Sequence, residues 1–70
     1  MPESIKNEVN KLRMSKNLTQ EELGDSLGVS RQTIIAIERG NYTPSILLAL
    51  KISNFFDVPV EEIFNISYEK

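Results

Sequence analysis

The chain has no cysteine, histidine or tryptophan, and only three glycines and three prolines among its 70 residues. Without cysteine or histidine, disulfide frameworks, zinc fingers, thiol nucleophiles and serine–histidine–aspartate catalysis are excluded. The longest apolar run, residues 46–50, is far shorter than the roughly 20 residues of a membrane-spanning helix. Residues 1–4 lack the basic and apolar regions of a secretory signal. We therefore expect one cytoplasmic domain, residues 1–70, that is not an enzyme and has no metal, cofactor or membrane segment.

Apolar residues make up 40% of the chain, a proportion typical of globular proteins. Residues 5–16 repeat at helical spacing through Ile5, Val9, Leu12 and Lys16. A second helix is predicted to begin at Thr19, with Glu22 completing a capping box, and to end at Gly28. A third begins after Ser30 and ends at Gly40.

Two more helices are predicted in the last third of the chain. Thr43 followed by Pro44 is a start signal for a strongly apolar fourth helix that runs to Phe56. A break at residues 57–59 precedes a short fifth helix, and the tail 66–68 alternates as either a strand or a frayed end would. The fold class is therefore predicted to be all-α, a compact five-helix bundle with an optional C-terminal strand.

The second and third helices are joined by a short turn that contains Gly28 and Val29, the arrangement of a helix-turn-helix over residues 19–39. Gly24 lies one turn before Gly28. A glycine inside a helix costs about 1 kcal/mol relative to alanine, so close packing of the two helices explains it best.

On a helical wheel, the third helix has two dissimilar faces. Ser30, Ile34 and Ile37 define the side predicted to be buried, and the opposite side, which we call the reading face, carries Arg31, Gln32, Ile35, Ala36 and Arg39. Arginine can bind guanine and glutamine can bind adenine through paired hydrogen bonds, while alanine or isoleucine can touch a thymine methyl group. This face has the chemistry of a helix that reads the DNA major groove.

Several motifs follow one another in a fixed order: LR at 12–13, LTQEELG at 18–24, LGVSRQTI at 27–34, IERG at 37–40 and TPS at 43–45. Over residues 5–64 this string resembles the phage-repressor and Cro type of helix-turn-helix, the XRE family. Gly24 departs from the alanine that is usual there and should soften the second helix without changing its docking. The resemblance implies a lambda-repressor-like domain that binds double-stranded DNA with its third helix in the major groove.

The resemblance also implies roles for individual residues. Arg13 and Glu38 match a half-buried ion pair that joins the first and third helices, so Glu38 is expected to be structural. Gln20 matches a position that contacts phosphate and supports the base-reading side chains. The expected DNA-binding residues are Gln20, Arg31, Gln32, Thr33, Ala36, Arg39, Asn41, Tyr42 and Thr43.

Some of these positions have ordinary alternatives. Ala36 contacts a base or is simply a good helix former. Ile35 touches a thymine methyl group or is covered by its neighbours. The Tyr42 ring contacts the DNA backbone or packs on the fourth helix, and Thr33 contacts a phosphate or a methyl group.

The last third of the chain has more apolar residues than a core of this size needs. Ile46, the first apolar residue of the fourth helix, is predicted to lie in the core. We expect residues 44–70 to form a homodimer interface, as the resemblance also implies, through Phe55, Val60, Ile63, Phe64, Ile66 and Tyr68. A two-fold dimer would bind a near-palindromic operator. The function expected is therefore a sequence-specific transcriptional regulator, most simply a repressor. The alternative is an antitoxin or adaptor that binds another protein through the apolar C-terminal region.

The net charge of −2 is unevenly distributed. Residues 11–54 carry six basic and four acidic side chains, whereas residues 55–70 carry four acidic and one basic. The acidity gathers in the region assigned to dimerisation, so the overall charge does not exclude DNA as a partner. It predicts weak non-specific binding and dependence on base contacts and two-fold avidity.

Overall fold

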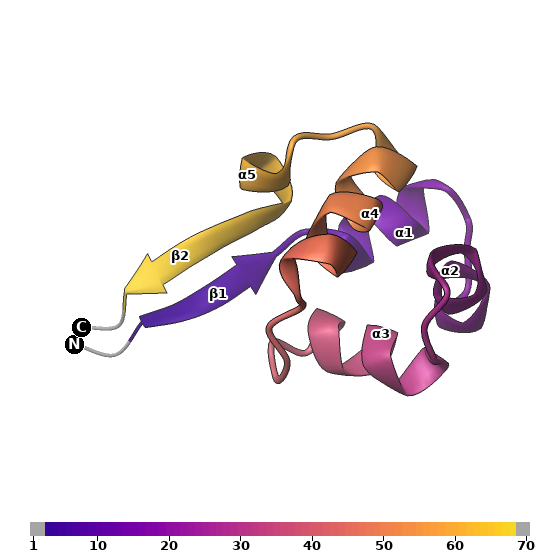
Figure 1. Cartoon of the computed structure of the whole chain (residues 1–70), viewed down its shortest axis with the longest axis horizontal. Helices are drawn as coiled ribbons and strands as arrows, with labels where there is room; N and C mark the ends of the chain where they lie inside the picture. Colours follow the sequence, from indigo (N-terminus) through magenta and orange to yellow (C-terminus); the bar gives the residue numbers. More distant parts are fainter. Residues whose placement is uncertain (1–2, 69–70) are drawn as a thin grey trace.

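The computed structural model describes residues 3–68, which contain five helices and two strands. The elements are β1 (Glu3–Asn7), α1 (Val9–Ser15), α2 (Gln20–Leu27), α3 (Arg31–Glu38), α4 (Ile46–Phe56), α5 (Val60–Ile63) and β2 (Phe64–Tyr68). The helices gather into one body, and β1 and β2 form an antiparallel ribbon that projects from it (Figure 1). The molecule is accordingly elongated, 36 × 23 × 22 Å.

The helix-turn-helix begins and ends where its local signals predict. The Thr19 hydroxyl accepts a hydrogen bond from the Glu22 amide, and the Glu22 carboxylate accepts one from the Thr19 amide, which confirms the capping box. Gly28 ends α2 in the left-handed conformation, at φ 77°. Ser30 caps α3 by accepting a hydrogen bond from the Thr33 amide.

Gly24 is buried where α2 meets the turn. A β-carbon added there would lie 2.8 Å from the Val29 carbonyl oxygen and 3.2 Å from that of Ser30. The Val29 amide also donates a hydrogen bond to the Gly24 carbonyl. The missing side chain therefore allows the turn to fold back on α2. The predicted close approach is present, but it is to the backbone of the turn at Val29 and Ser30 and not to a crossing helix.

The prediction of a helix from Ile5 is wrong, and so is a strictly all-α fold. Residues 3–7 are a strand, with Ile5 paired to Ile66 across the ribbon, and α1 begins only at Val9. The Asn7 side-chain oxygen accepts a hydrogen bond from the Val9 amide and so marks the change from strand to helix. Pairing with β2 makes residues 3–7 a strand. The helical spacing of apolar residues in 5–16 could not predict this, because β2 lies at the other end of the chain.

The prediction that Thr43 caps α4 is wrong, because the helix begins two residues later. Ser45, and not Thr43, caps the helix by accepting the Leu48 amide, and Pro44 lies outside it. Ile46, expected in the core, is 80% exposed. Since each helical residue turns about 100°, Ile46 points away from Leu48, which begins the buried stripe of α4.

One core fills the space between the helices. Its members come from every helix: Val9, Leu23, Leu27, Ile34, Ile37, Leu48, Ile52, Phe56 and Ile63. The rings of Phe55 and Phe56 meet edge to face, 5.0 Å apart. Among residues 3–68, no side chain of β1 belongs to this buried cluster. The end of the ribbon that lies away from the helices is therefore held mainly by the pairing of β1 with β2.

Candidate nucleic-acid interface

Ile34 and Ile37 lie on the buried side of α3 as predicted, but the prediction that Ser30 is buried is wrong. Ser30 is exposed, because as the N-cap it has an extended backbone and does not follow the helical wheel. Ile34 and Ile37 are fully buried, whereas Arg31 and Gln32 are exposed and Ala36 is half-buried. Burial of the two isoleucines fixes the rotation of the helix about its axis. The reading face therefore points outward, with its arginine and glutamine side chains accessible at the N-terminal end.

Thr33 and Ile35 are half-buried, whereas Arg31 and Gln32 on the same helix are exposed. The Thr33 hydroxyl lies 3.0 Å from the Ser30 hydroxyl, within hydrogen-bonding distance, and both residues take part in the helix cap. Ile35 is half-buried at the rim of the reading face.

The loop after α3 carries the other expected contacts. Arg39 ends the helix, Gly40 takes a positive φ of 78°, and Asn41, Tyr42 and Thr43 are exposed. The Asn41 amide donates to the Ala36 carbonyl, which holds the beginning of the loop against the end of the helix. Tyr42 is 45% exposed and therefore accessible to a partner.

Glu38 is the centre of a hydrogen-bond network that joins α1, α2 and α3. Its Oε2 accepts from Arg13 Nε at 2.7 Å. Its Oε1 accepts from Arg13 Nη2, Asn10 Nδ2 and Gln20 Nε2, each at 3.1 Å. Arg13 also donates from Nη1 to the Leu18 carbonyl at 2.7 Å. The ion pair expected between Arg13 and Glu38 is thus present, within a larger network.

This network shifts the ionisation of both partners. Burial raises the pKa of Glu38, but hydrogen bonds from Arg13, Asn10 and Gln20 and the positive charge of Arg13 outweigh it, so the pKa lies below its ordinary value. The hydrogen bond to Glu38 raises the pKa of Arg13 against the opposing effect of burial. Both groups are therefore charged near neutral pH, and the carboxylate of Glu38 is engaged in holding helices together.

Gln20 is half-buried at the first position of α2, and its amide nitrogen is held by Glu38 on α3. The side chain therefore couples the start of α2 to the end of α3. Asn10 is a member of the network that the sequence interpretation missed. Its position three residues before Arg13, on the same helix face, was the available signal.

The charge of this surface suits a phosphate backbone. Within residues 3–68, neither Arg31 nor Arg39 has a carboxylate within 4.0 Å. Glu38, the acidic residue next to Arg39 in the sequence, is neutralised by Arg13. Two arginines are thus available to an anionic partner.

The residues expected at a dimer interface fall into three groups. Ile66 and Tyr68 are exposed, at 61% and 60%. Phe55, Val60 and Phe64 are half-buried. Ile63 is fully buried in the core of its own chain, because the single turn of α5 directs it inward, and it presents no surface to a partner.

The ribbon has one apolar and one polar face. Directly paired residues in an antiparallel ribbon share a face, so Ile5 lies beside Ile66, Glu3 beside Tyr68 and Asn7 beside Phe64. We call this the apolar ribbon face. The opposite face carries Ser4, Lys6, Asn65 and Ser67. Ile5, 39% exposed, is an addition to the apolar surface that the helical interpretation of residues 5–16 concealed.

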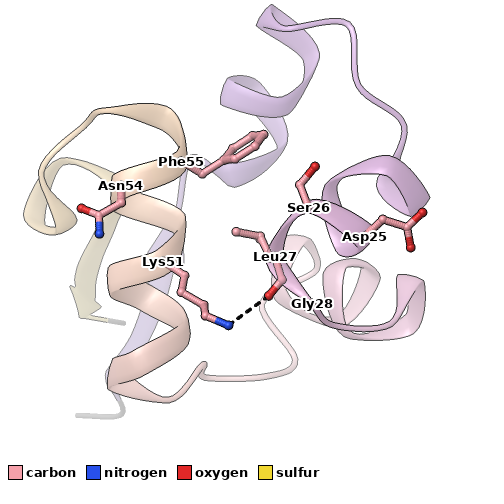
Figure 2. A pocket seen from close by; sticks show the side chains of 7 residues that line it. All are labelled: Asp25, Ser26, Leu27, Gly28, Lys51, Asn54 and Phe55. Atoms are coloured by element: carbon pink, nitrogen blue, oxygen red, sulfur yellow. Dashed lines mark hydrogen bonds between the residues drawn. The ribbon is translucent and has the colours of Figure 1, made fainter.

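Figure 2 shows a shallow depression between the C-terminal end of α2 and α4. Lys51 reaches across it and donates from Nζ to the Leu27 carbonyl at 3.4 Å, near the end of α2, where a positive charge is favourable. The depression is lined by Asp25, Ser26, Leu27, Gly28, Lys51, Asn54 and Phe55. None of these is an expected DNA-binding residue.

Over residues 3–68, no helix is long and apolar enough to cross a membrane, and no cluster of acidic side chains is suited to hold a metal ion.

Comparison with known proteins identifies the family. The sequence model of a helix-turn-helix family matches residues 9–63, and the chain belongs to this family, in its XRE type. An uncharacterized HTH-type transcriptional regulator of Methanocaldococcus jannaschii is 58% identical over 60 residues, which cover 86% of this chain and 91% of the relative. The chain is therefore a DNA-binding transcriptional regulator and not an enzyme.

Two further matches extend the comparison. The cryptic phage CTXphi transcriptional repressor RstR of Vibrio cholerae is 35% identical over 52 residues, 74% of this chain but only 47% of the repressor. Among solved structures, the restriction-modification controller protein C.AhdI of Aeromonas hydrophila superposes with a TM-score of 0.70. It is 31% identical over 77% of this chain and 82% of its own.

Proposed function

We propose that the chain represses transcription as a homodimer that binds a near-palindromic operator and inserts α3 of each copy into the major groove. The observation that carries the proposal is the outward reading face of α3, fixed by the burial of Ile34 and Ile37 on its other side. Exposed Arg31 and Gln32 present the donors and acceptors that read guanine and adenine. Occlusion of a promoter by such a dimer is the simplest route to repression, and the likeness to RstR supports it.

The remaining site residues would then divide between base and backbone contacts. Arg31, Gln32 and Ala36 read bases, and Thr33 and Arg39 flank them. Asn41, Tyr42 and Thr43 on the exposed loop contact the backbone. The Gln20 side chain donates one Nε2 hydrogen to Glu38 and would donate the other to a phosphate.

Residues 44–70, joined by Ile5 of β1, would supply the dimer contact, centred on the apolar ribbon face. A two-stranded ribbon is marginally stable in water unless something covers its apolar side. Ile66 and Tyr68 lie on that side, and both are mostly exposed in the single chain. Because Ile5 and Ile66 at the centre of this face are uncharged, two copies can meet there about a two-fold axis without like-charge repulsion. Phe55, Val60 and Phe64 at the base of the ribbon would extend it.

Selection of binding sites from random DNA tests the proposal most directly. Two inverted half-sites about 10 bp apart are expected, because two-fold recognition helices lie about one helical turn apart. Affinity should fall as salt rises, since phosphate contacts release counterions. Failure to enrich any sequence, or binding that salt does not weaken, would favour the protein adaptor instead.

Two further measurements test the finer statements. Sedimentation across a concentration series should show a monomer–dimer equilibrium, and a monomer at every concentration would overturn the homodimer. A reporter gene placed behind the selected operator should be expressed less when the chain is present. Increased expression would make the chain an activator.

A further inference from the structure

Asn7 connects the ribbon to the recognition helix, and nothing in the expected DNA contacts assigns it a role. It is the last residue of β1 and is paired with Phe64 of β2. Its Oδ1 accepts the Val9 amide at 3.0 Å, and its Nδ2 donates to the Ile37 carbonyl at 2.8 Å. The half-buried side chain therefore uses both ends of its amide, one on α1 and one on α3.

The hydrogen bond to Ile37 joins residues 30 positions apart. The Ile37 carbonyl already accepts the Gly40 amide at 3.0 Å, so the helix end is satisfied without Asn7. Asn7 adds a tether between α3 and a neighbouring element. Ile37 is fully buried, and the tethered end of α3 leads directly into Arg39 and the exposed loop.

Further hydrogen bonds attach the base of the ribbon and the end of α3 to the helices around them. The Glu8 amide donates to the Ile63 carbonyl at 2.9 Å, which fixes the base of the ribbon to α5. The neighbouring α3 residue, Glu38, is bound by Asn10 and Arg13 of α1. The end of α3 is therefore held by two independent attachments, and only Asn7 among these side chains belongs to the ribbon.

We propose that Asn7 is a positioning residue for DNA binding: it sets the direction of α3 relative to the ribbon and thereby the half-site spacing that the dimer accepts. The inference rests on the proposed two-fold function, in which the ribbon lies at the dimer contact. With Asn7 in place, the two reading faces are held at one separation. Without its amide donor, each α3 pivots about the Glu38 network, and operators of other spacing are tolerated.

The experiment uses DNA selected by the wild-type chain, together with the same sequence lengthened or shortened by one and two base pairs between the half-sites. Each added base pair moves a half-site by about 3.4 Å and rotates it by about a tenth of a turn. The wild-type chain should lose about tenfold or more in affinity per step, as for a disrupted base position. Asn7→Ser keeps an acceptor for the Val9 amide but cannot reach Ile37, and its affinity should vary about threefold or less across the set.

Asn7→Asp provides a second variant of the same size that also lacks the donor. Its added charge is matched by Asn65→Asp on the polar ribbon face, which should keep the wild-type spacing profile. Asn65 is exposed, and no side-chain hydrogen bond within residues 3–68 links it to α3. All chains are compared below the temperature at which the least stable one unfolds.

The outcomes separate this inference from the proposed function. If the wild-type chain selects no DNA, or a single half-site, both fail. If it selects paired half-sites but the Asn7 variants bind uniformly more weakly with an unchanged spacing profile, Asn7 is merely structural and the inference is overturned. A measurement without variants completes the test: side-chain amide exchange at Asn7 should be slower than at Asn65, and equal rates would overturn the tether.

Discussion

The helix-turn-helix and the ribbon differ in where their apolar side chains lie. In α2 and α3, Leu23, Leu27, Ile34 and Ile37 are buried in the common core, and polar side chains face outward. In the ribbon, Ile66 and Tyr68 remain mostly exposed. The first region is complete within one chain, whereas the second has an apolar surface that a partner can still cover. The proposed function thus places DNA recognition on the first kind of surface and self-association on the second.

The largest expected effect tests how firmly the helical body is held. Arg13→Met should lower the free energy of unfolding by about 3–5 kcal/mol, because it leaves the buried Glu38 carboxylate without its cation. Urea unfolding followed by circular dichroism measures the loss. The control is Lys11→Met, which removes a solvent-exposed ion pair with Glu8 and should cost less than about 1 kcal/mol. Equal losses would contradict the central role of the Glu38 network.

A second pair of variants compares the core with the ribbon using one residue type. Ile63→Ala should destabilise the chain by about 2–5 kcal/mol, because the residue is fully buried. Ile66→Ala should change unfolding of the single chain by about 0.5 kcal/mol or less but weaken self-association in sedimentation. Asn65→Ala, on the polar ribbon face, serves as the control. If Ile66→Ala left the dimer intact, the apolar ribbon face would not be its contact.

The third effect concerns the reading face and not stability. Arg31→Ala should weaken operator binding by about 1–3 kcal/mol and relax the preference at one base position. Gln20→Ala should weaken binding more evenly across sequences, as expected for a phosphate contact. The control Lys11→Ala removes an exposed positive charge from α1 and should change neither the affinity for the operator nor the base preference. Unchanged affinity and preference in Arg31→Ala would show that α3 is turned differently on DNA.

The smallest effect is the dependence of stability on pH. Because the pKa of folded Glu38 lies below the ordinary 4.5, its ionised form stabilises the fold fully above that pH. The contribution is lost as the pH falls through the folded pKa. The difference in unfolding free energy between the wild-type chain and Glu38→Gln should therefore shrink on acidification below 4.5. A difference that is constant with pH would rule out this titration.

Local signals made the helix-turn-helix predictable. The caps at Thr19 and Ser30 and the turn at Gly28 each depend on residues within a few positions of one another. The rotation of α3 follows from the spacing of two isoleucines. The start of α4 was misplaced because both Thr43 and Ser45 are good caps, and only packing of Leu48 into the core selects the second.

The sequence by itself determined the helical unit, its turn and the outward direction of Arg31 and Gln32, because helical periodicity and capping act over one or two turns. The tertiary structure alone decided that residues 3–7 form a strand, since their partner lies at the other end of the chain. It also decided that Glu38 gathers Asn10 and Gln20, 28 and 18 positions away. Such contacts depend on where the folded helices place their side chains, and a pattern within one helix does not predict contacts between residues that are distant in sequence.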